Sequence, residues 1–366
     1  MRILLTGANG FIGRNLQVFL RSIPDIHVEI LNHLEDPVEK ISSKSYFDLI
    51  IHLAGVNRTQ YPEDFQNGNL GFTKKILGCA RLQDVPPSII FTSSTQVLSD
   101  SSYGKSKLAC ERELQKYSSA TKKSVDILRI PNVYGKWART NYNSVVATFA
   151  SLLHNNLKPN FINEYELIDF IYIDDLCNEI IKKIIDNKHV INLVQFITPL
   201  TAHDVYSKFL KYVNFSKSNE LPMIMEPLDK KLFATFQSYK PANLWQNSLK
   251  VVQDERGDFS EILQIGDCNQ FSLLRIKPGQ TRGEHFHNTK MERFIVISGD
   301  VDIHFIEIHS GNHKTIEIRG KSLISVDAIP GWWHSLENIG KEVADVLVWA
   351  NERFDPNVPD TYRWEW

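Results

Sequence analysis

The chain has 366 residues, more than a single hydrophobic core usually holds, so we expect two domains. Its 41 basic and 43 acidic side chains give a net charge of −2 with no long run of either sign, which argues against nucleic-acid and membrane-surface partners. Scattered cysteines, an N-terminus that enters a glycine turn at once, and only short apolar runs predict a reduced, cytoplasmic protein without signal peptide or membrane insertion.

The first two-thirds of the chain alternate short apolar runs with helical patterns. Between several of these runs lie apolar residues at helical spacing, such as Leu16, Phe19 and Leu20. Such alternation predicts an α/β domain with a Rossmann-type, doubly wound parallel sheet and helices on both faces. The expected strands, rich in β-branched residues, are residues 2–6, 27–31, 47–54, 88–93, 124–130 and 189–194.

The pattern changes after about Trp245 to short alternating runs separated by glycine turns, with no convincing helix. We therefore expect an all-β, antiparallel barrel or sandwich there. The domains are placed at residues 1–243 and 244–366. The expected strands of the second domain lie within residues 270–278, 292–308, 313–320, 322–330 and 344–352.

The segment TGANGFIG at residues 6–13 follows a predicted strand and opens a helical pattern. Glycines at this point allow a tight turn and let the backbone approach a pyrophosphate, which then meets the N-terminus of the helix. We expect a dinucleotide cofactor to contact the following residues: Gly7, Asn9, Gly10, Phe11, Ile12 and Gly13.

The end of the second predicted strand bears on the choice of cofactor. NAD enzymes favour a carboxylate there, whereas this strand ends in Asn32 and His33. A cationic Arg14 and a polar His33 suit a 2′-phosphate, so we expect NADPH. The alternative for Arg14 is an ordinary solvated helix side chain.

Tyr103 and Lys107 lie four residues apart, on one face of a predicted helix. A nearby ammonium favours phenolate, so we expect Lys107 to lower the pKa of Tyr103 and make it a proton donor. The strand end IIFTSSTQV offers Ser94, or Thr95, to hydrogen-bond a substrate carbonyl.

Together these residues resemble the extended short-chain dehydrogenase/reductase family. Further matching segments, in the family's order, are FDLIIHLAG, RIPNVYG and FIYIDD. The resemblance implies that Tyr103 donates a proton, Lys107 binds the nicotinamide ribose and Ser94 orients the carbonyl. It also implies cofactor contacts at the following residues: Leu53, Ala54, Gly55 and Pro131.

Near the other end of the chain, His285 and His287 alternate on a predicted strand, so both side chains face one side. With Glu292 and His334 their spacing resembles the motif pair of cupins, although the second motif, IPGWWH, is the looser match. The resemblance implies a small β-barrel that holds a divalent metal on these four residues. Imidazole and carboxylate suit zinc, nickel, manganese or iron, and zinc is our first choice.

The segment TRGEHFH also resembles deoxysugar epimerases built on the same barrel, in which the equivalent histidine is a general base. One lone pair of His285 cannot serve both a metal and a proton, so ligand and base are alternatives. Packed polar histidines and a purely structural metal are the simpler alternatives. Lys290 is expected to be a surface-turn lysine rather than a group that stabilises an enolate.

Over its whole length the chain resembles CapF-type bifunctional enzymes of capsular polysaccharide and O-antigen synthesis. The most specific stretches are GKWARTNYNSVVATF and the terminal WANERFDPNVPDTY. The resemblance implies a homodimer that epimerises carbon 3 of UDP-2-acetamido-2,6-dideoxy-L-arabino-4-hexulose. NADPH then reduces carbon 4 to give UDP-2-acetamido-2,6-dideoxy-L-talose, a precursor of UDP-N-acetyl-L-fucosamine. The alternatives are a plain 4-ketoreductase with a metal-stabilised dimerisation barrel, and a barrel that senses sugar or metal.

Overall fold

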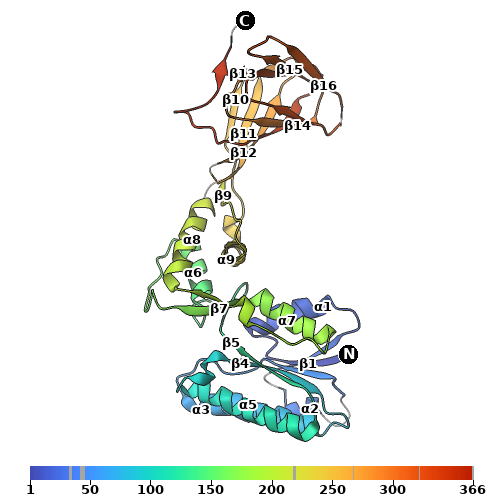
Figure 1. Cartoon of the computed structure of the whole chain (residues 1–366), viewed down its shortest axis with the longest axis vertical. Helices are drawn as coiled ribbons and strands as arrows, with labels where there is room; N and C mark the ends of the chain where they lie inside the picture. The colour runs from blue at the N-terminus through green and yellow to red at the C-terminus, as the bar shows by residue number, and fades with distance from the viewer. Residues whose placement is uncertain (33–34, 42–45, 217–219, 267, 321, 365–366) are drawn as a thin grey trace. The chain divides into compact units, whose positions relative to one another are not determined.

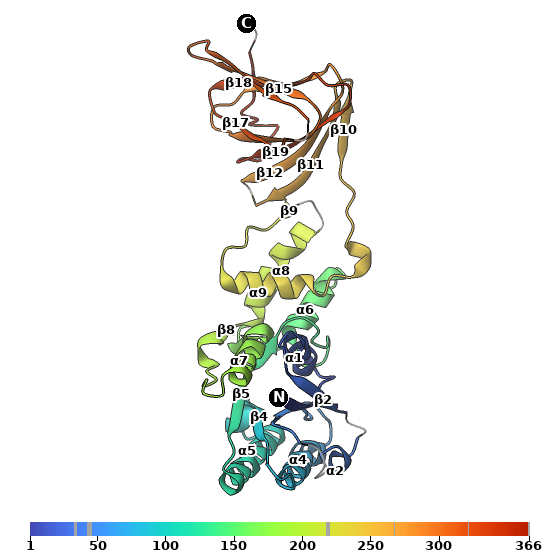
Figure 2. The same ribbon diagram turned by 90° about the vertical axis from the view of Figure 1, so that its right-hand side faces the viewer.

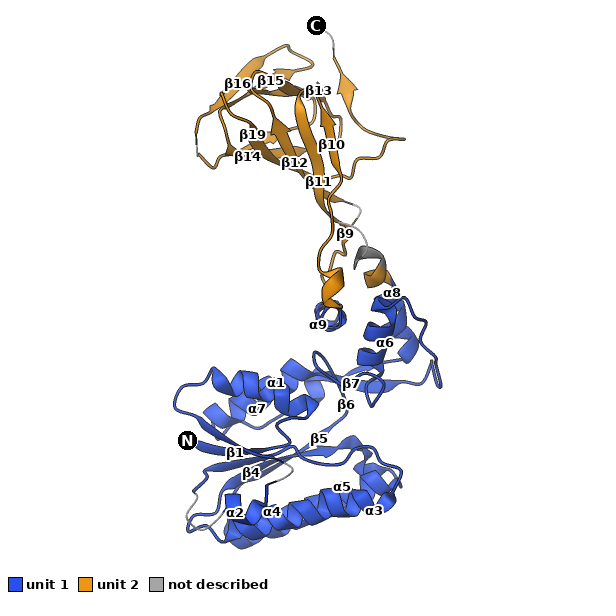
Figure 3. Cartoon of the chain, turned by 180° about the vertical axis from the view of Figure 1, so that it is seen from behind, with its two compact units in different colours: residues 1–210, 226–240 blue, residues 211–225, 241–366 orange. Residues whose placement is uncertain are grey.

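The computed structural model describes residues 1–32, 35–41, 46–216, 220–266, 268–320 and 322–364. The chain forms two compact units (Figure 3): unit 1 holds residues 1–210 and 226–240, and unit 2 holds residues 211–225 and 241–366. From the sequence we expected one boundary after residue 243. We did not expect residues 211–225 to belong to unit 2. Among the described residues, no helix has the length and apolar character needed to cross a membrane.

Unit 1 is built on a five-stranded parallel sheet in the order β2-β1-β3-β4-β5 (Figure 1). Four of the five strands fall within segments predicted from the sequence, and β4 extends one residue past its predicted segment, so the predicted parallel α/β domain is confirmed. The strands are β1 (Arg2–Thr6), β2 (His27–Leu31), β3 (Leu49–His52), β4 (Ser88–Ser94) and β5 (Val125–Ile130).

Helices cover both faces of this sheet, because successive strand residues point to opposite sides. Leu5 and Ile51 pack in a core with α1 and α7, whereas Leu4 and Ile50 pack in a second core with α4 and α5. Figure 1 shows α1 and α7 on one side of the sheet and α5 on the other. The helices are α1 (Phe11–Arg21), α2 (Pro37–Lys40), α3 (Pro62–Phe65), α4 (Phe72–Arg81), α5 (Ser102–Thr121), α6 (Val145–His154), α7 (Ile173–Ile185), α8 (Ala202–Ser216) and α9 (Pro227–Gln237).

The strand predicted at residues 189–194 is wrong. Residues 189–193 have no regular structure, and a 3₁₀ turn follows at Val194–Phe196. Val190 and Val194 are 78% and 75% exposed, so their side chains have no core to enter. Unit 1 also contains a small sheet in the order β6-β7-β8. Its strands are β6 (Asn132–Tyr134), β7 (Ile168–Tyr172) and β8 (Thr198–Leu200).

Unit 2 consists mainly of two antiparallel sheets (Figure 2). One has the order β10-β11-β12-β19-β14-β17, with β9 beside β11, and the other has the order β16-β15-β18-β13-β20. Phe294 and Val346 of the first sheet share one core with Phe305 and Leu336 of the second, so the sheets pack face to face. The predicted mostly-β second domain is thereby confirmed.

The strands of unit 2 are β9 (Glu220–Leu221), β10 (Val251–Asp254), β11 (Gly257–Ile265), β12 (Asn269–Ile276), β13 (Thr281–Phe286), β14 (Glu292–Ser298), β15 (Val301–Glu307), β16 (His313–Ile318), β17 (Ser325–Ala328), β18 (Trp332–Asn338), β19 (Ala344–Ala350) and β20 (Tyr362–Arg363).

Candidate functional sites

The glycine turn of unit 1 lies against the carboxyl end of β3. Gly7 has a φ of +69°, and a Cβ there would come within 2.7 Å of the Ala54 nitrogen. A Cβ on Gly13 would lie 2.2 Å from the Gly7 carbonyl oxygen. Because both positions exclude a side chain, the turn stays tight, and α1 begins directly after Gly10 with its N–H groups open to an anion. The structure thus brings the predicted cofactor residues of the turn beside Leu53 and Ala54.

A carboxylate that the sequence did not lead us to expect lies beyond the end of β2. Glu35 Oε2 accepts a hydrogen bond from the Asn32 N–H over 2.8 Å. The residue lies beyond the strand, so a search of the strand tip alone could not find it. Arg14 is exposed and forms no ion pair with any residue that the structure describes. His33 lies outside the described residues.

Tyr103 lies in the first turn of α5, which Ser101 caps by accepting a hydrogen bond from the Gly104 N–H over 3.0 Å. Ser94, the last residue of β4, is buried and close enough to the phenol to lower its pKa. Burial raises the pKa of Tyr103, and Ser94 offsets only part of that rise. The expected lowering of this pKa by Lys107 is therefore wrong for this structure, because burial dominates.

Lys107 is 5% exposed and lies where α5 meets two strand ends. Its Nζ donates to the Thr92 carbonyl over 2.8 Å and lies 4.6 Å from the centroid of the Phe91 ring. A Cβ on Gly55 would come within 3.4 Å of the same Nζ, so this predicted cofactor residue faces the ammonium. Burial lowers the pKa of Lys107 to about 8. Pro131, also predicted, is buried directly after β5.

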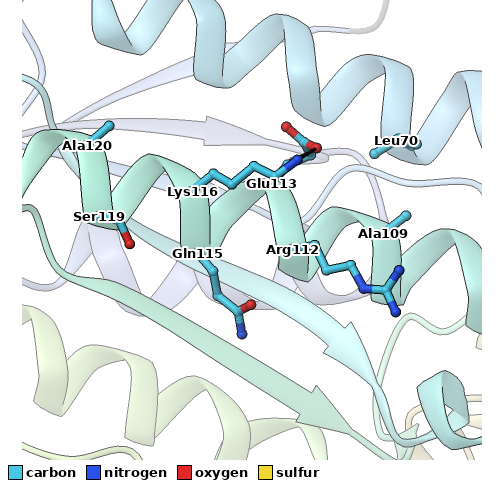
Figure 4. Close-up of a pocket in the computed structure, with 8 residues that line it drawn as sticks. All are labelled: Leu70, Ala109, Arg112, Glu113, Gln115, Lys116, Ser119 and Ala120. Atoms are coloured by element: carbon cyan, nitrogen blue, oxygen red, sulfur yellow. Dashed lines mark hydrogen bonds and ion pairs between the residues drawn. The ribbon is translucent and has the colours of Figure 1, made fainter.

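A cavity on another part of α5 contains none of the predicted site residues (Figure 4). Within it, Lys116 donates to Glu113 over 2.8 Å, an ordinary ion pair one helical turn apart. The cavity is lined by Leu70, Ala109, Arg112, Glu113, Gln115, Lys116, Ser119 and Ala120. It therefore does not mark the candidate dinucleotide site.

In unit 2 the structure brings together the four predicted metal ligands. One ligand atom from each of His285, His287, Glu292 and His334 lies within 4.8 Å of the others. Strand β13 carries His285, which is paired in register with His334 of β18, and Glu292 begins β14. A bulge between Gly283 and His285, where Gly283 has a φ of +91°, sets this register.

The charges and hydrogen bonds of this cluster fit a divalent cation. The Nε2 atoms of His287 and His334 lie 3.6 and 3.3 Å from Glu292 Oε2, and both are buried without a hydrogen-bond partner among the described residues. Burial lowers the pKa of His285 to about 4, so the ring is neutral at pH 7. Burial opposes ionisation of Glu292, but His287 and His334 outweigh it and hold its pKa well below its usual range. Imidazoles around one carboxylate are a typical donor set for such a metal.

The outer nitrogens of two imidazoles face backbone carbonyls. His287 Nδ1 lies 2.5 Å from the Asp360 carbonyl oxygen, and His334 Nδ1 lies 3.4 Å from that of Trp332. A carbonyl only accepts, so Nδ1 carries the hydrogen and the Nε2 lone pair faces the cluster. Lys290, expected at a surface turn, is 5% exposed and donates to the Pro359 carbonyl over 3.1 Å, so that expectation is wrong.

Comparison with known proteins relates both units to sugar-nucleotide enzymes. Residues 3–193 match the NAD dependent epimerase/dehydratase family, and residues 252–362 match the polysaccharide biosynthesis C-terminal domain. A UDP-2-acetamido-2,6-beta-L-arabino-hexul-4-ose reductase of Pseudomonas aeruginosa is 34% identical over 99% of this chain and 98% of its own length.

Two solved structures resemble the chain at different levels of similarity. The capsular polysaccharide assembling protein CapF from Staphylococcus aureus is 34% identical, with 100% of both chains covered and a TM-score of 0.91. UDP-glucuronic acid 4-epimerase from Bacillus cereus, solved with NAD, is 19% identical, covers 67% of this chain and 100% of its own, and has a TM-score of 0.53. This second likeness is one of fold.

Proposed function

This chain belongs to the CapF-type members of the NAD dependent epimerase/dehydratase family, and from that premise we propose that it is a bifunctional sugar-nucleotide enzyme of capsule or O-antigen synthesis. Unit 2 epimerises carbon 3 of UDP-2-acetamido-2,6-dideoxy-L-arabino-4-hexulose. Unit 1 then reduces carbon 4 with NADPH to give UDP-2-acetamido-2,6-dideoxy-L-talose, on the route to UDP-N-acetyl-L-fucosamine. One observation carries the proposal: a single chain holds two sites that both suit one ketone, around Tyr103 and around Glu292.

In unit 1 we assign the reduction to Ser94, Tyr103 and Lys107. The bound nicotinamide supplies the hydride that carbon 4 receives. The Ser94 hydroxyl orients the ketone oxygen, and the Tyr103 phenol gives that oxygen its proton as negative charge develops there. The Lys107 ammonium binds the nicotinamide ribose.

The preference for NADPH rests on Arg14. Its guanidinium is exposed and free of ion pairs with the described residues, so it is available to a 2′-phosphate. Glu35 at the end of β2 counts in the opposite direction, because a carboxylate there favours the ribose hydroxyls of NAD. Its oxygen is already engaged by the Asn32 N–H, so we retain NADPH.

In unit 2 we propose a cupin-type site in which His287, Glu292 and His334 hold a divalent metal, with zinc as the first choice. His285 is either the fourth ligand or the general base that takes the proton from carbon 3. Such an ion supplies Lewis-acid stabilisation of the charge that develops on the ketone oxygen when carbon 3 loses its proton. Glu292 would lower the net charge of the ion, and the imidazoles would complete its coordination. A proton from solvent, added on the opposite face, would invert carbon 3 alone.

A second candidate function is a 4-ketoreductase whose unit 2 holds a structural or sensing metal. Four protein ligands close a tetrahedral site, which is the arrangement of structural zinc, whereas catalytic zinc keeps one position open. If His285 is instead the general base, the remaining three ligands leave such a position. The two functions therefore differ in what His285 does.

The deciding experiment follows the hydrogen at carbon 3 by proton NMR in heavy water, with the full-length protein, the 4-keto sugar nucleotide and no NADPH. Loss of the signal supports epimerisation, and retention by folded, metal-loaded protein that still oxidises NADPH supports the second candidate. A His285→Asn variant that loses exchange but keeps its metal identifies a base, and loss of both identifies a ligand.

We also propose that the protein is a cytoplasmic homodimer. Sedimentation equilibrium of the full-length protein measures the number of subunits.

A further inference from the structure

The C-terminal segment of residues 351–363 lies along the stretch of chain that carries the cluster residues. At one end, Asn351 Oδ1 accepts a hydrogen bond from the Met291 N–H over 2.7 Å. At the other end, β20 pairs with the end of β13, and the rings of Phe286 and Tyr362 stack at 5.3 Å. The loop between His285 and Glu292 is thus held from both sides by residues of one later segment.

Asp360 makes the most hydrogen bonds to this loop. Its carboxylate accepts from the successive N–H groups of Asn288, Thr289 and Lys290 over 3.1, 2.9 and 2.9 Å. It also accepts from the Thr289 hydroxyl over 3.1 Å. Successive N–H groups aimed at one anion form a nest, and here a side chain of the same protein occupies it. The carboxylate therefore fixes the loop directly after His287.

The backbone of Asp360 acts on His287 itself. Its carbonyl oxygen lies 2.5 Å from His287 Nδ1, and its φ of +36° is in the left-handed region, where aspartate is one of the tolerated residues. The side chain holds the loop and the carbonyl holds the ring, so one residue sets both the position and the tautomer of His287. The Nε2 of His287 is buried without a hydrogen bond to any described atom, and it faces Glu292.

We propose that Asp360 is a positioning residue of the metal site, and that ion binding is coupled through it to the docking of the C-terminal segment. The proposal rests on the metal site proposed above. An outer partner that fixes a ligand's tautomer raises metal affinity without touching the ion. Coupling is reciprocal, so a segment that strengthens ion binding when docked is itself held more firmly once the ion is bound.

The primary test measures the Kd of zinc by competition with a chromophoric chelator, with full-length protein. We expect Asp360→Ala to weaken zinc binding about 10–100-fold, the range found for outer-shell partners of metal ligands. Asp360→Asn keeps the size and one acceptor oxygen, so we expect a smaller loss, and this variant serves if the alanine variant does not fold. Asp355→Ala is the matched control, because Asp355 lies in the same segment and its side chain bonds, among the described residues, only to Asn357 of that segment.

A second measurement separates positioning from a merely structural role. Zinc should slow hydrogen exchange of residues 288–290 and 351–363 in the wild type, and much less in Asp360→Ala. NMR of the ring nitrogens should show His287 protonated at Nδ1 in the wild type, with both tautomers populated in the variant.

Two outcomes overturn the proposal, and they can be told apart. Folded Asp360 variants with wild-type zinc affinity overturn the positioning role while the metal site stands. A folded wild-type protein that binds no zinc, nickel, manganese or iron overturns the metal site and this inference together.

Discussion

The Nζ of Lys107 donates a hydrogen bond to the backbone carbonyl of Thr92 over 2.8 Å. This bond ties the helix that carries Tyr103 to the strand that ends at Ser94. The same ammonium faces Gly55 in the loop after β3. Its charge is therefore placed among three segments of the proposed reductase site, and the consequences of losing that charge can be measured.

We expect kcat/KM for reduction to fall as the pH rises through about 8, because burial lowers the pKa of Lys107 to about 8. A lysine is charged below its pKa and neutral above it, so the loss lies on the alkaline side. NADPH oxidation followed across neutral and alkaline pH gives the profile. In Lys107→Arg the guanidinium stays charged, so the alkaline fall should move to higher pH; an unmoved fall would assign it to another group.

Tyr103→Phe should lower kcat for reduction about 10²–10⁴-fold, because the variant removes the proposed proton donor. Exchange at carbon 3 should continue, since unit 2 carries that step. Tyr117→Phe is the matched control on the same helix: its hydroxyl donates to the Pro87 carbonyl over 2.8 Å, and its loss should cost about 1 kcal/mol of stability without affecting the rate. A Tyr103→Phe enzyme of normal rate would rule out this assignment.

Arg14→Ala should raise KM for NADPH about tenfold and leave KM for NADH unchanged, because it removes a charged partner of the 2′-phosphate. Steady-state kinetics with both cofactors measures the change. Arg21→Ala, in the last turn of the same helix, removes an equal charge far from the glycine turn and should change neither value. Equal effects of Arg14→Ala on both cofactors would refute the phosphate contact.

Glu292→Gln should raise the Kd for the metal by at least about 10–100-fold, because it removes the charged ligand itself. That range is typical of mutations of outer-shell partners, which do not touch the metal. Metal content by mass spectrometry and exchange at carbon 3 should fall together, whereas NADPH oxidation with a 3-epimerised ketone should persist. Removal of metal by a chelator should have the same effect in the wild type. Glu342→Gln, on an exposed turn, controls for the loss of one carboxylate.

Much of unit 1 could be predicted because its central strands β1, β3 and β4 are largely buried and read as continuous apolar runs, such as residues 49–51. Residues 189–194 have the same composition, but a local pattern does not reveal which run finds a partner strand. The strands β6 and β8 have only 3 residues each, too few to show an alternation.

The cluster residues of unit 2 could be found from sequence because histidines and a glutamate recur at a characteristic spacing. Asp360 could not, because its carbonyl is a group that every residue has, and its contact with His287 exists only after the chain has folded. Lys290 was misread for the same reason: a turn lysine is usually solvated, and only the later segment buries it.

The order of segments along the chain also constrains how the protein is made. Strand β9 is synthesised before α9, yet it pairs with β11, which is synthesised after it. Since α9 belongs to unit 1, the ribosome delivers a piece of unit 2, then the closing helix of unit 1, and then the rest of unit 2. A gene fragment that starts after α9 would leave Gln264 and Ile265 without their β9 partners, and an unpaired strand edge invites aggregation.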